Sequence, residues 1–360
     1  MAQKELTASL INRIDKNPES AIKKLDLVYV DRDQLSILRK KSGKNFTYLH
    51  NGKKLSKSKH LDRIKSLVIP PAWENVKISI LHNGHIQATG RDAKNRRQYR
   101  YHPIWNKVKN QTKFFKMAEF GDCLPAIRDQ IEKDIIQKEW TKTKVLALVI
   151  KLMEETHIRI GNRYYAKKNK TYGLTTLRSK HVHLYKNKLR FQFTGKKGKE
   201  HNITLKNKNL LMLVGKCEEI PGWELFQFYD SKGGKHNVDS SMVNEYLYAI
   251  AGKSFTAKDF RTWSGSVIFF ETLMDYERPI SEKQRDKNIL SAFDATAQEL
   301  GNTRNVCRKY YVHPILVESY KNDTLHDVFT KIETSPIIST HLTPTESSVL
   351  ELIKSYKPTI

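Results

Sequence analysis

Two adjacent tyrosines in the last fifth of the chain are candidate nucleophiles. Tyr310 and Tyr311 lie in the stretch Leu300 to Pro314 and follow three cationic residues, Arg304, Arg308 and Lys309. Nearby positive charge favours the phenolate form of a tyrosine and attracts a phosphodiester. The stretch therefore predicts attack on a nucleic-acid phosphate, and the residues alone leave open which tyrosine would attack.

Cleavage of a phosphodiester by a side chain needs more than a nucleophile. Cations must neutralise the charge at phosphorus, and an acid must protonate the leaving oxygen. The sequence has no Asp/Glu cluster at metal-binding spacing, no His-Glu-x-x-His and no EF-hand loop. Residues 194–200 also have their glycines and lysines in the wrong order for a Walker A loop. We therefore expect a site built from Arg and Lys, with no metal and no cofactor.

The charge of the chain favours a polyanionic partner. Lys and Arg outnumber Asp and Glu by 64 to 38, which leaves a formal charge of +26. Because the excess runs along the whole chain, DNA or RNA is the expected partner. A basic surface that serves only solubility, or a ribosome-like role, is the alternative that composition leaves open.

Cysteine usage and hydropathy limit the class of protein further. Cys123, Cys217 and Cys307 lie far apart, which argues against a disulfide framework and against a zinc site of the usual spacing. No apolar run reaches membrane-spanning length, and the N-terminus has no apolar signal segment. We expect a soluble, intracellular protein with no membrane association.

The elements that would position these residues are predicted to be of two kinds. Strands are expected early in the chain, at residues 27–30, 46–49, 76–80 and 86–90, with a hairpin signal at Asn83-Gly84. Helical spacing begins near Trp105 and predicts helices at 115–120, 127–136, 145–153, 242–251, 260–274 and 281–300. Thr256 is expected to cap the helix at 260–274, with Asp259 at the third helical position.

The expected fold class is α+β. A short β insert at residues 181–185, 189–193 and 202–205 interrupts the helical part, with a turn at 195–198. We predict a β-rich DNA-binding domain over residues 1–120 and a mainly helical catalytic domain over 121–325. Residues 326–360 are predicted to be a C-terminal tail, loosely attached from 335 onward because that stretch is rich in Ser, Thr and Pro.

Four separate blocks carry a family resemblance. They are His157 to Tyr165 with Tyr172 to Val182, Phe193 to Lys196, Lys258 to Trp263, and Leu300 to Pro314. In this order and spacing they resemble the catalytic blocks of type IB DNA topoisomerases, most closely the short poxvirus, bacterial and giant-virus (mimivirus-like) branch. The resemblance covers about residues 25 to 320, and it implies a tyrosine recombinase/topoisomerase IB type of catalytic domain.

The resemblance implies a role for each catalytic position. Arg159 and Arg261 would hold the non-bridging oxygens of the scissile phosphate, where guanidinium geometry suits the developing charge. Lys196 would protonate the leaving 5′ oxygen. The family's nucleophile lies nine residues after the position of Asn302, which selects Tyr311. Asn302 stands where poxviral enzymes have histidine, so it can donate a hydrogen bond but cannot titrate.

Other readings of the same residues stay open without the resemblance. Arg159 would then be a surface arginine after a core helix, and Lys196 one of four lysines in residues 196–206. Tyr99 and Tyr101 share one face of a strand and would either contact DNA or pack on the core. The predicted DNA contacts, in part implied by the resemblance, are Gln98, Tyr99, Tyr101, Tyr165, Lys258, Arg91, Arg96 and Arg97.

The resemblance implies an ATP- and metal-independent enzyme that relaxes supercoiled duplex DNA through a 3′-phosphotyrosine. It would act as a monomer on double-stranded DNA, in the virion and viral factory of a virus or in the cytoplasm of a bacterium. A tyrosine site-specific recombinase is one alternative, although recombinases usually carry His-x-x-Arg where this chain has Lys258-x-x-Arg261. A non-catalytic architectural DNA-binding protein is the other.

Overall fold

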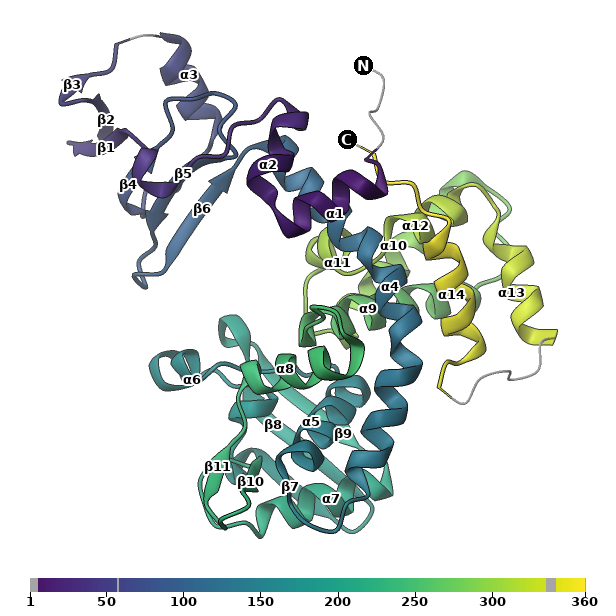
Figure 1. Ribbon diagram of the computed structural model, residues 1–360. Helices are drawn as coiled ribbons and strands as arrows, with labels where there is room; N and C mark the ends of the chain where they lie inside the picture. Colours follow the sequence, from purple (N-terminus) through teal and green to yellow (C-terminus); the bar gives the residue numbers. More distant parts are fainter. Residues whose placement is uncertain (1–5, 57, 335–340, 360) are drawn as a thin grey trace. The chain divides into compact units, whose positions relative to one another are not determined.

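The structure is a computed structural model that describes residues 6–56, 58–334 and 341–359. The described chain forms two compact units, one up to Phe115 together with the stretch from Lys357, the other from Lys116 to Tyr356. The division falls inside helix α4 (Pro103–Ile135), which is continuous in Figure 1. The limits of the domains at 120 and 325 stay predictions.

The first unit is built on an antiparallel sheet. Its strands lie in the order β3-β2-β1-β4-β5-β6. The bounds are β1 (Ile37–Ser42), β2 (Asn45–His50), β3 (Lys53–Lys54), β4 (Glu74–Ile78), β5 (Ile86–Arg91) and β6 (Arg97–Tyr101). Ile37, Val76 and Ile78 are buried on one face and pack with Ile64 of α3 (Ser58–Ser66). The predicted strands at 46–49, 76–80 and 86–90 are thereby confirmed within a residue or two at most ends.

The predicted strand at residues 27–30 is wrong. Val28 makes only an isolated bridge to Gly84, and the residues before it form α1 (Ala8–Lys16) and α2 (Pro18–Ile22). Thr7 caps α1 by accepting a hydrogen bond from the Leu10 amide, and the helix buries Ile11 and Ile14 against Trp105. The pairing does not extend beyond Val28, because the Val30 amide donates to the ring nitrogen Nδ1 of His85 at 3.0 Å and not to a strand backbone.

The second unit is mainly helical. Its helices are α5 (Lys142–Thr156), α6 (Arg163–Asn169), α7 (Lys208–Glu218), α8 (Ser240–Ala251), α9 (Ala257–Met274), α10 (Glu282–Glu299), α11 (Arg304–Tyr310), α12 (Pro314–Lys321), α13 (Leu325–Thr334) and α14 (Pro344–Lys354). The predicted β insert is confirmed as β7 (Val182–Tyr185), β8 (Lys188–Thr194) and β9 (Glu200–Leu205), which pair antiparallel in that order. A further pair, β10 (Gln227–Tyr229) and β11 (Lys235–Asn237), was not predicted. The helices expected at 115–120 and 127–136 are one helix, α4, with Pro125 inside it.

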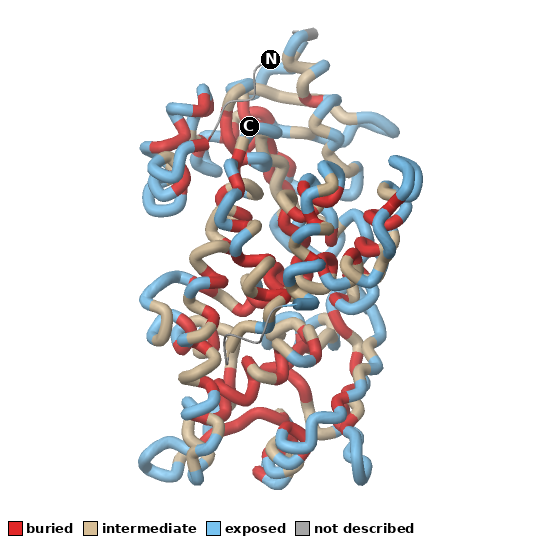
Figure 2. The backbone as a smooth tube through the Cα atoms, turned by 90° about the vertical axis from the view of Figure 1, so that its right-hand side faces the viewer, coloured by how far each residue is buried: buried red, intermediate tan, exposed pale blue. Residues whose placement is uncertain are grey.

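Helix α5 lies at the centre of this unit. Every residue from Val145 to Ile150 is at most 1 % exposed, because α7, α8, α9, β9 and β10 contact it from several sides. In Figure 2 the buried residues (red) lie mainly in the interior, and the exposed residues (pale blue) lie mainly at turns and on outer faces. A helix that is apolar all round needs such an enclosed place. The C-terminal end of α5 leads directly into the loop that carries Arg159.

The prediction of a loosely attached tail from residue 335 onward is wrong for residues 341–359. Helix α14 has a capping box formed by Thr343 and Glu346, and it buries Val349, Leu350 and Ile353. Residues 335–340, which the same prediction covered, lie outside the described residues. The segment from 341 onward is therefore a docked helix, not a tail.

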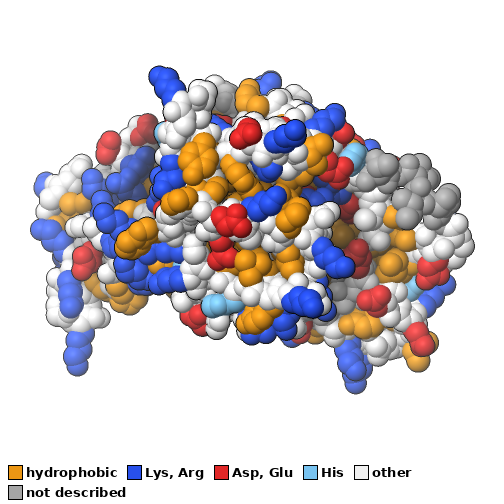
Figure 3. All heavy atoms as spheres, turned by 90° about the horizontal axis from the view of Figure 1, so that it is seen from below, with side chains coloured by type: hydrophobic (Ala, Val, Ile, Leu, Met, Phe, Trp, Pro, Cys, Tyr) orange, Lys and Arg blue, Asp and Glu red, His pale blue; other side chains and the backbone are white. Residues whose placement is uncertain are grey.

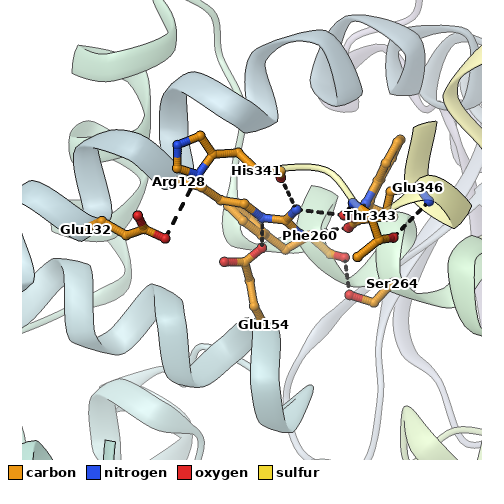
Figure 4. A network of polar contacts seen from close by, with 9 residues as sticks. Arg128, Glu132, Glu154, Phe260, Ser264, His341, Thr343 and Glu346 are labelled. Atoms are coloured by element: carbon orange, nitrogen blue, oxygen red, sulfur yellow. Dashed lines mark hydrogen bonds and ion pairs between the residues drawn. The ribbon is translucent and has the colours of Figure 1, made fainter. Parts of the chain in front are cut away.

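An ion-pair network fastens α14 to the rest of the unit (Figure 4). Arg128 of α4 donates to both carboxylate oxygens of Glu346 at 2.7 Å and to Glu154 of α5 at 3.0 Å. Glu346 also accepts a hydrogen bond from the indole of Trp263, on α9, at 3.0 Å. Burial raises the pKa of Glu154, whereas Arg128 outweighs burial and lowers the pKa of Glu346. The network joins four helices, and α9 among them carries Arg261.

The positive charge is spread over the surface. Figure 3 shows Lys and Arg side chains across the whole of one face, interspersed with hydrophobic side chains and with fewer acidic ones. Among the described residues, no helix has both the length and the apolar composition to cross a membrane.

Candidate active site

Five predicted residues from four separate segments are neighbours in the second unit. Arg159 follows α5, Lys196 lies between β8 and β9, Arg261 lies on α9, and Asn302 and Tyr311 flank α11. Arg159 donates a hydrogen bond to Asn302, and the Arg261 guanidinium carbon lies 5.5 Å from the centre of the Tyr311 ring. Lys196 is near enough for the charges of Arg159 and Tyr311 to shift its pKa. The fold therefore brings together residues that are up to 152 positions apart, from 159 to 311.

Arg261 is the most deeply buried of the five. Its residue is 4 % exposed, and its guanidinium donates to the carbonyl oxygens of His157 and of Leu300, the latter at 2.7 Å. Burial, followed by the charge of Arg159, lowers the pKa of Arg261 to about 10. At neutral pH the side chain is still a cation, and it is held in place by backbone oxygens. The predicted capping box of Thr256 and Asp259, which begins α9, is confirmed.

The loop that carries Arg159 is held by its own backbone. The carbonyl oxygens of Arg159 and Ile160 accept hydrogen bonds from the amides of Leu174 at 2.8 Å and Thr175 at 2.7 Å. A side chain at Gly173 would come within 2.4 Å of the Arg159 carbonyl oxygen, so this close approach requires glycine. The half-buried side chain of Arg159 is thereby directed at Asn302.

Asn302 leaves one donor unused. Gly301, with φ of +57°, ends α10, and the Asn302 amide donates to the Ala297 carbonyl at 2.8 Å. The side-chain oxygen accepts the hydrogen bond from Arg159. The side-chain nitrogen is buried and, apart from the Cys307 thiol nearby, has no hydrogen-bond partner among the described residues. A buried N–H without a partner is costly, so this donor is available to a ligand oxygen.

Tyr311 and Tyr310 have different environments. Tyr310 is 40 % exposed, and Lys309 lies over its ring. Tyr311 is half-buried, and its carbonyl oxygen accepts a hydrogen bond from the Ser266 hydroxyl of α9 at 3.2 Å. Burial would raise the pKa of Tyr311, but Arg261 and Arg159 outweigh it and lower the pKa below the ordinary value. The surroundings of Tyr311 therefore favour its phenolate.

The cations next to Tyr311 in sequence are not those next to it in space. Arg304 forms an ion pair with Asp294, at 2.6 Å from its Nε atom, and Arg308 and Lys309 are exposed on α11. The positive field at Tyr311 comes instead from Arg261, Arg159 and Lys196. The initial expectation of a field from Arg304, Arg308 and Lys309 is therefore wrong.

Lys196 lies at the tip of the β8–β9 hairpin. The tip is closed by the Gly195 amide donating to the Lys199 carbonyl at 2.7 Å, and Lys197 and Gly198 adopt positive φ. The Lys196 side chain is exposed, yet partial loss of hydration and the charge of Arg159 lower its pKa. A lysine with a lowered pKa gives up a proton more readily than an ordinary one.

The predicted DNA contacts lie on exposed or half-buried surfaces of both units. In the first unit Asp92 binds Arg96 at 2.7 Å and Gln98 at 2.9 Å, while Tyr99 and Tyr101 share one face and stack with ring centres 5.7 Å apart. The two tyrosines also pack against the buried cluster of Val30, Leu35 and Ile86, so packing accounts for part of their placement. The exposed or half-buried arginines Arg91 and Arg97 lie on β5 and β6. In the second unit Tyr165 on α6 and Lys258 on α9 are exposed.

One further residue at the site was not predicted. His201 of β9 pairs with Phe193 across the hairpin, and its ring lies against Gly195 and Gly301. The sequence could have indicated His201, because pairing of the two hairpin strands places it beside Gly195. The contact of His201 with Gly301 could not be predicted, because the two residues are a hundred positions apart.

The chain matches known sequence families over most of its length. A profile described as the catalytic core of eukaryotic DNA topoisomerase I matches residues 102–335, and one described as the N-terminal domain of bacterial DNA topoisomerase IB matches residues 45–92. These matches include all five residues of the candidate site.

Named viral proteins are similar over most of both chains. The DNA topoisomerase 1B of Acanthamoeba polyphaga mimivirus is 33 % identical over 296 residues, which cover 80 % of this chain and 88 % of the relative. The DNA topoisomerase 1B of Vaccinia virus (strain Copenhagen) is 24 % identical over 245 residues, covering 67 % and 74 %. The DNA topoisomerase 1 of Rabbit fibroma virus (strain Kasza) is 27 % identical over 247 residues, covering 65 % and 72 %.

Proposed function

Because this chain belongs to the type IB DNA topoisomerases, in the giant-virus, poxvirus and bacterial branch, we propose that Tyr311 cuts and reseals one DNA strand to relax supercoils. The observation that carries the proposal is the position of Tyr311 beside Arg261 and Arg159, whose charges outweigh burial and lower the pKa of its phenol. A phenolate at neutral pH is a far better nucleophile than a phenol.

The cleavage step transfers a phosphoryl group from one oxygen to another. Tyr311 first loses its phenol proton to solvent, and the phenolate oxygen then bonds to phosphorus while the bond from phosphorus to the 5′ oxygen breaks and Lys196 gives its proton to that oxygen. The products are a 3′-phosphotyrosine and a free 5′-hydroxyl. The phosphodiester's free energy is retained in the new ester, so the hydroxyl can reverse the step once the strand has rotated, and ATP is not required.

The arginines would stabilise the charge that develops at phosphorus. Arg261 is fixed before substrate arrives, because backbone oxygens of His157 and Leu300 hold it. Preorganised cations of this kind cost no reorganisation during the reaction. The free side-chain N–H of Asn302 would add a hydrogen bond to a phosphate oxygen. Because side chains would supply the positive charge that stabilises the phosphate, we expect relaxation to proceed without added metal.

The substrate we propose is duplex DNA, bound by a monomer. The net charge of +26 favours a polyanion, and exposed or half-buried basic and aromatic residues occur in both units, on β5, β6, α6 and α9. Phosphate contacts of this kind make affinity strongly dependent on salt.

Plasmid relaxation in EDTA without ATP tests the proposal. Wild-type protein is expected to relax supercoiled plasmid and, when stopped with SDS, to remain covalently attached to DNA at Tyr311. Tyr311→Phe is expected to lose both activities, because it has no hydroxyl to attack. Tyr310→Phe is the matched control and should keep both. Relaxation by purified Tyr311→Phe, or an adduct mapped to another residue, would contradict the proposal.

A further inference from the structure

The imidazole of His201 fills a space between two catalytic segments. Its ring stacks on Phe193, with centres 4.9 Å apart and planes inclined by 13°. A Cβ atom on Gly195 would lie 2.5 Å from the His201 Cδ2 atom, and a Cβ atom on Gly301 would lie 2.9 Å from its Cε1 atom. Both neighbours must therefore lack a side chain for the ring to occupy this place. Gly195 precedes Lys196, and Gly301 precedes Asn302.

We propose that His201 is a positioning residue, whose ring sets the Lys196 hairpin against the Gly301–Asn302 turn. The inference rests on the proposed function, in which Lys196 protonates the leaving oxygen. Apart from this ring, the hairpin is held by its own short turn and by the Tyr172 amide, which donates to the Thr194 carbonyl at 2.9 Å, and the Lys196 side chain is exposed. Because the ring contacts both segments, it fixes the distance between the Lys196 hairpin and the Gly301–Asn302 turn. Misplacement by about 1 Å can reduce a rate about 10²-fold.

The low pKa of the His201 ring is consistent with a packing role and argues against a role in proton transfer. Burial, followed by the charges of Arg159, Lys199 and Arg261, lowers the pKa of His201 to about 4. Near neutral pH the imidazole is uncharged, so it lacks the acidic imidazolium proton that a proton donor needs, and it does not repel the surrounding cations. Neither ring nitrogen makes a hydrogen bond within the described part of the chain. Shape and stacking are what the ring contributes.

Cleavage of two substrates under single-turnover conditions tests the role. One is an ordinary suicide duplex, and the other has sulfur in place of the 5′ bridging oxygen at the scissile position. A thiol has a pKa of about 8.5, so it leaves as a thiolate without a proton donor. We expect His201→Ala to cleave the ordinary duplex about 10- to 100-fold more slowly than wild type. On the sulfur substrate we expect it to match wild type within about threefold, as Lys196→Ala should.

The choice of variants separates positioning from folding and from proton transfer. His201→Phe keeps a flat ring and should retain most activity on both substrates. His183→Ala removes an exposed histidine from β7 of the same sheet and should behave as wild type. Equal loss on both substrates, or no loss in His201→Ala, would overturn the inference. The proposed function fails instead if wild-type protein forms no adduct with either substrate.

A double mutant tests the contact itself. Gly195 has φ of −97°, which alanine adopts without strain, and apart from His201 the nearest atom to an added Cβ is the Lys199 carbonyl oxygen at 3.5 Å. Gly195→Ala should therefore impair cleavage through its clash with His201. The variant Gly195→Ala with His201→Ala should cleave at least as fast as Gly195→Ala alone. Additive losses would contradict the contact. Gly301 is unsuited to this test, because its φ of +57° would strain alanine regardless of His201.

Discussion

Arg261 and Lys196 are both cations of the candidate site, yet the protein holds them in opposite ways. Arg261 lies on an 18-residue helix, is 4 % exposed, and is held by two backbone oxygens from separate segments. Lys196 lies on the tip of a hairpin, where its side chain is exposed. The difference matches the two tasks that we propose, because the arginine would meet the phosphate with a fixed charge whereas the lysine would reach the leaving atom. The α9 half of the site is held by backbone oxygens, and the hairpin half depends on the contact with His201 for its position.

The largest expected loss comes from the fixed half. Arg261→Ala should slow single-turnover cleavage by about 10³-fold, since one preorganised donor contributes about 10²–10³-fold and this one is also a buried charge. Arg261→Lys should recover little, because an ammonium cannot reproduce the planar two-donor geometry. A loss below about tenfold in Arg261→Ala would mean that α9 is not the phosphate-binding half.

The hairpin half should reveal itself in the pH profile. If Tyr311 attacks without its proton and Lys196 donates one, as we propose, the rate should rise as Tyr311 ionises and fall as Lys196 deprotonates. The pKa of Tyr311 is lowered because Arg261 and Arg159 outweigh burial, and that of Lys196 is lowered by lost hydration and by Arg159. Both limbs should therefore lie at lower pH than for free tyrosine and lysine.

Lys196→Ala should remove the falling limb and reduce the maximal rate by about 10²-fold. Single-turnover rates across the pH range measure both effects. Lys206→Ala, which changes an exposed lysine just beyond β9, is the control and should keep the full profile. A falling limb that persists in Lys196→Ala would assign the proton donor to another residue.

Asn302 supports Arg159, which lies on neither half, and should have a smaller effect. Asn302→Ala removes the oxygen that binds Arg159 and the free donor. A hydrogen bond to a charged group contributes about 1.5–3 kcal/mol, so we expect a loss of about 10- to 100-fold in cleavage. Asn302→His should restore part of the rate, because histidine can also donate. Unchanged cleavage in Asn302→Ala would show that Arg159 needs no side-chain support.

The network behind α9 should affect stability more than rate. Glu346→Ala leaves Arg128 with one of its two carboxylate partners and removes the acceptor of Trp263. Breaking a buried pair costs about 3 kcal/mol or more of the free energy of unfolding, and cleavage at low temperature should fall only a few-fold. Glu351→Ala, on the exposed face of the same helix, should change stability by less than about 0.5 kcal/mol. Denaturant unfolding of both variants decides whether the network supports the fixed half.

Local signals in the sequence predicted much of this arrangement. The Thr256–Asp259 capping box and the turn at residues 195–198, which contains Lys196, are visible within a few residues, and the structure has both. The catalytic roles of Tyr311, Arg159, Lys196, Arg261 and Asn302 stay predictions until the variants are measured. Composition misled us at the C-terminal end, where Ser, Thr and Pro indicated a tail. The capping-box residues Thr343 and Glu346 in the same segment would have indicated a helix.

Other features could not be predicted because they depend on distant residues. The partners of Arg128 lie on α5 and α14, and no local pattern selects Glu154 and Glu346 from the chain's 38 acidic residues. The burial of Arg261 depends likewise on carbonyl oxygens 104 and 39 positions away. Charge counts and periodicity say nothing about such contacts.

The backbone of Tyr311 is braced against α9. Its carbonyl oxygen accepts the hydrogen bond from Ser266, and a side chain at Gly265 would come within 3.1 Å of its Cβ atom. If Tyr311 forms the ester, it is the single covalent tie between protein and rotating DNA while the strand is open. Mechanical torque from the turning duplex would then pass through one phenol into the backbone and on to α9. A nucleophile whose backbone is hydrogen-bonded to α9 can bear that load without drifting from the hydroxyl that must return to it.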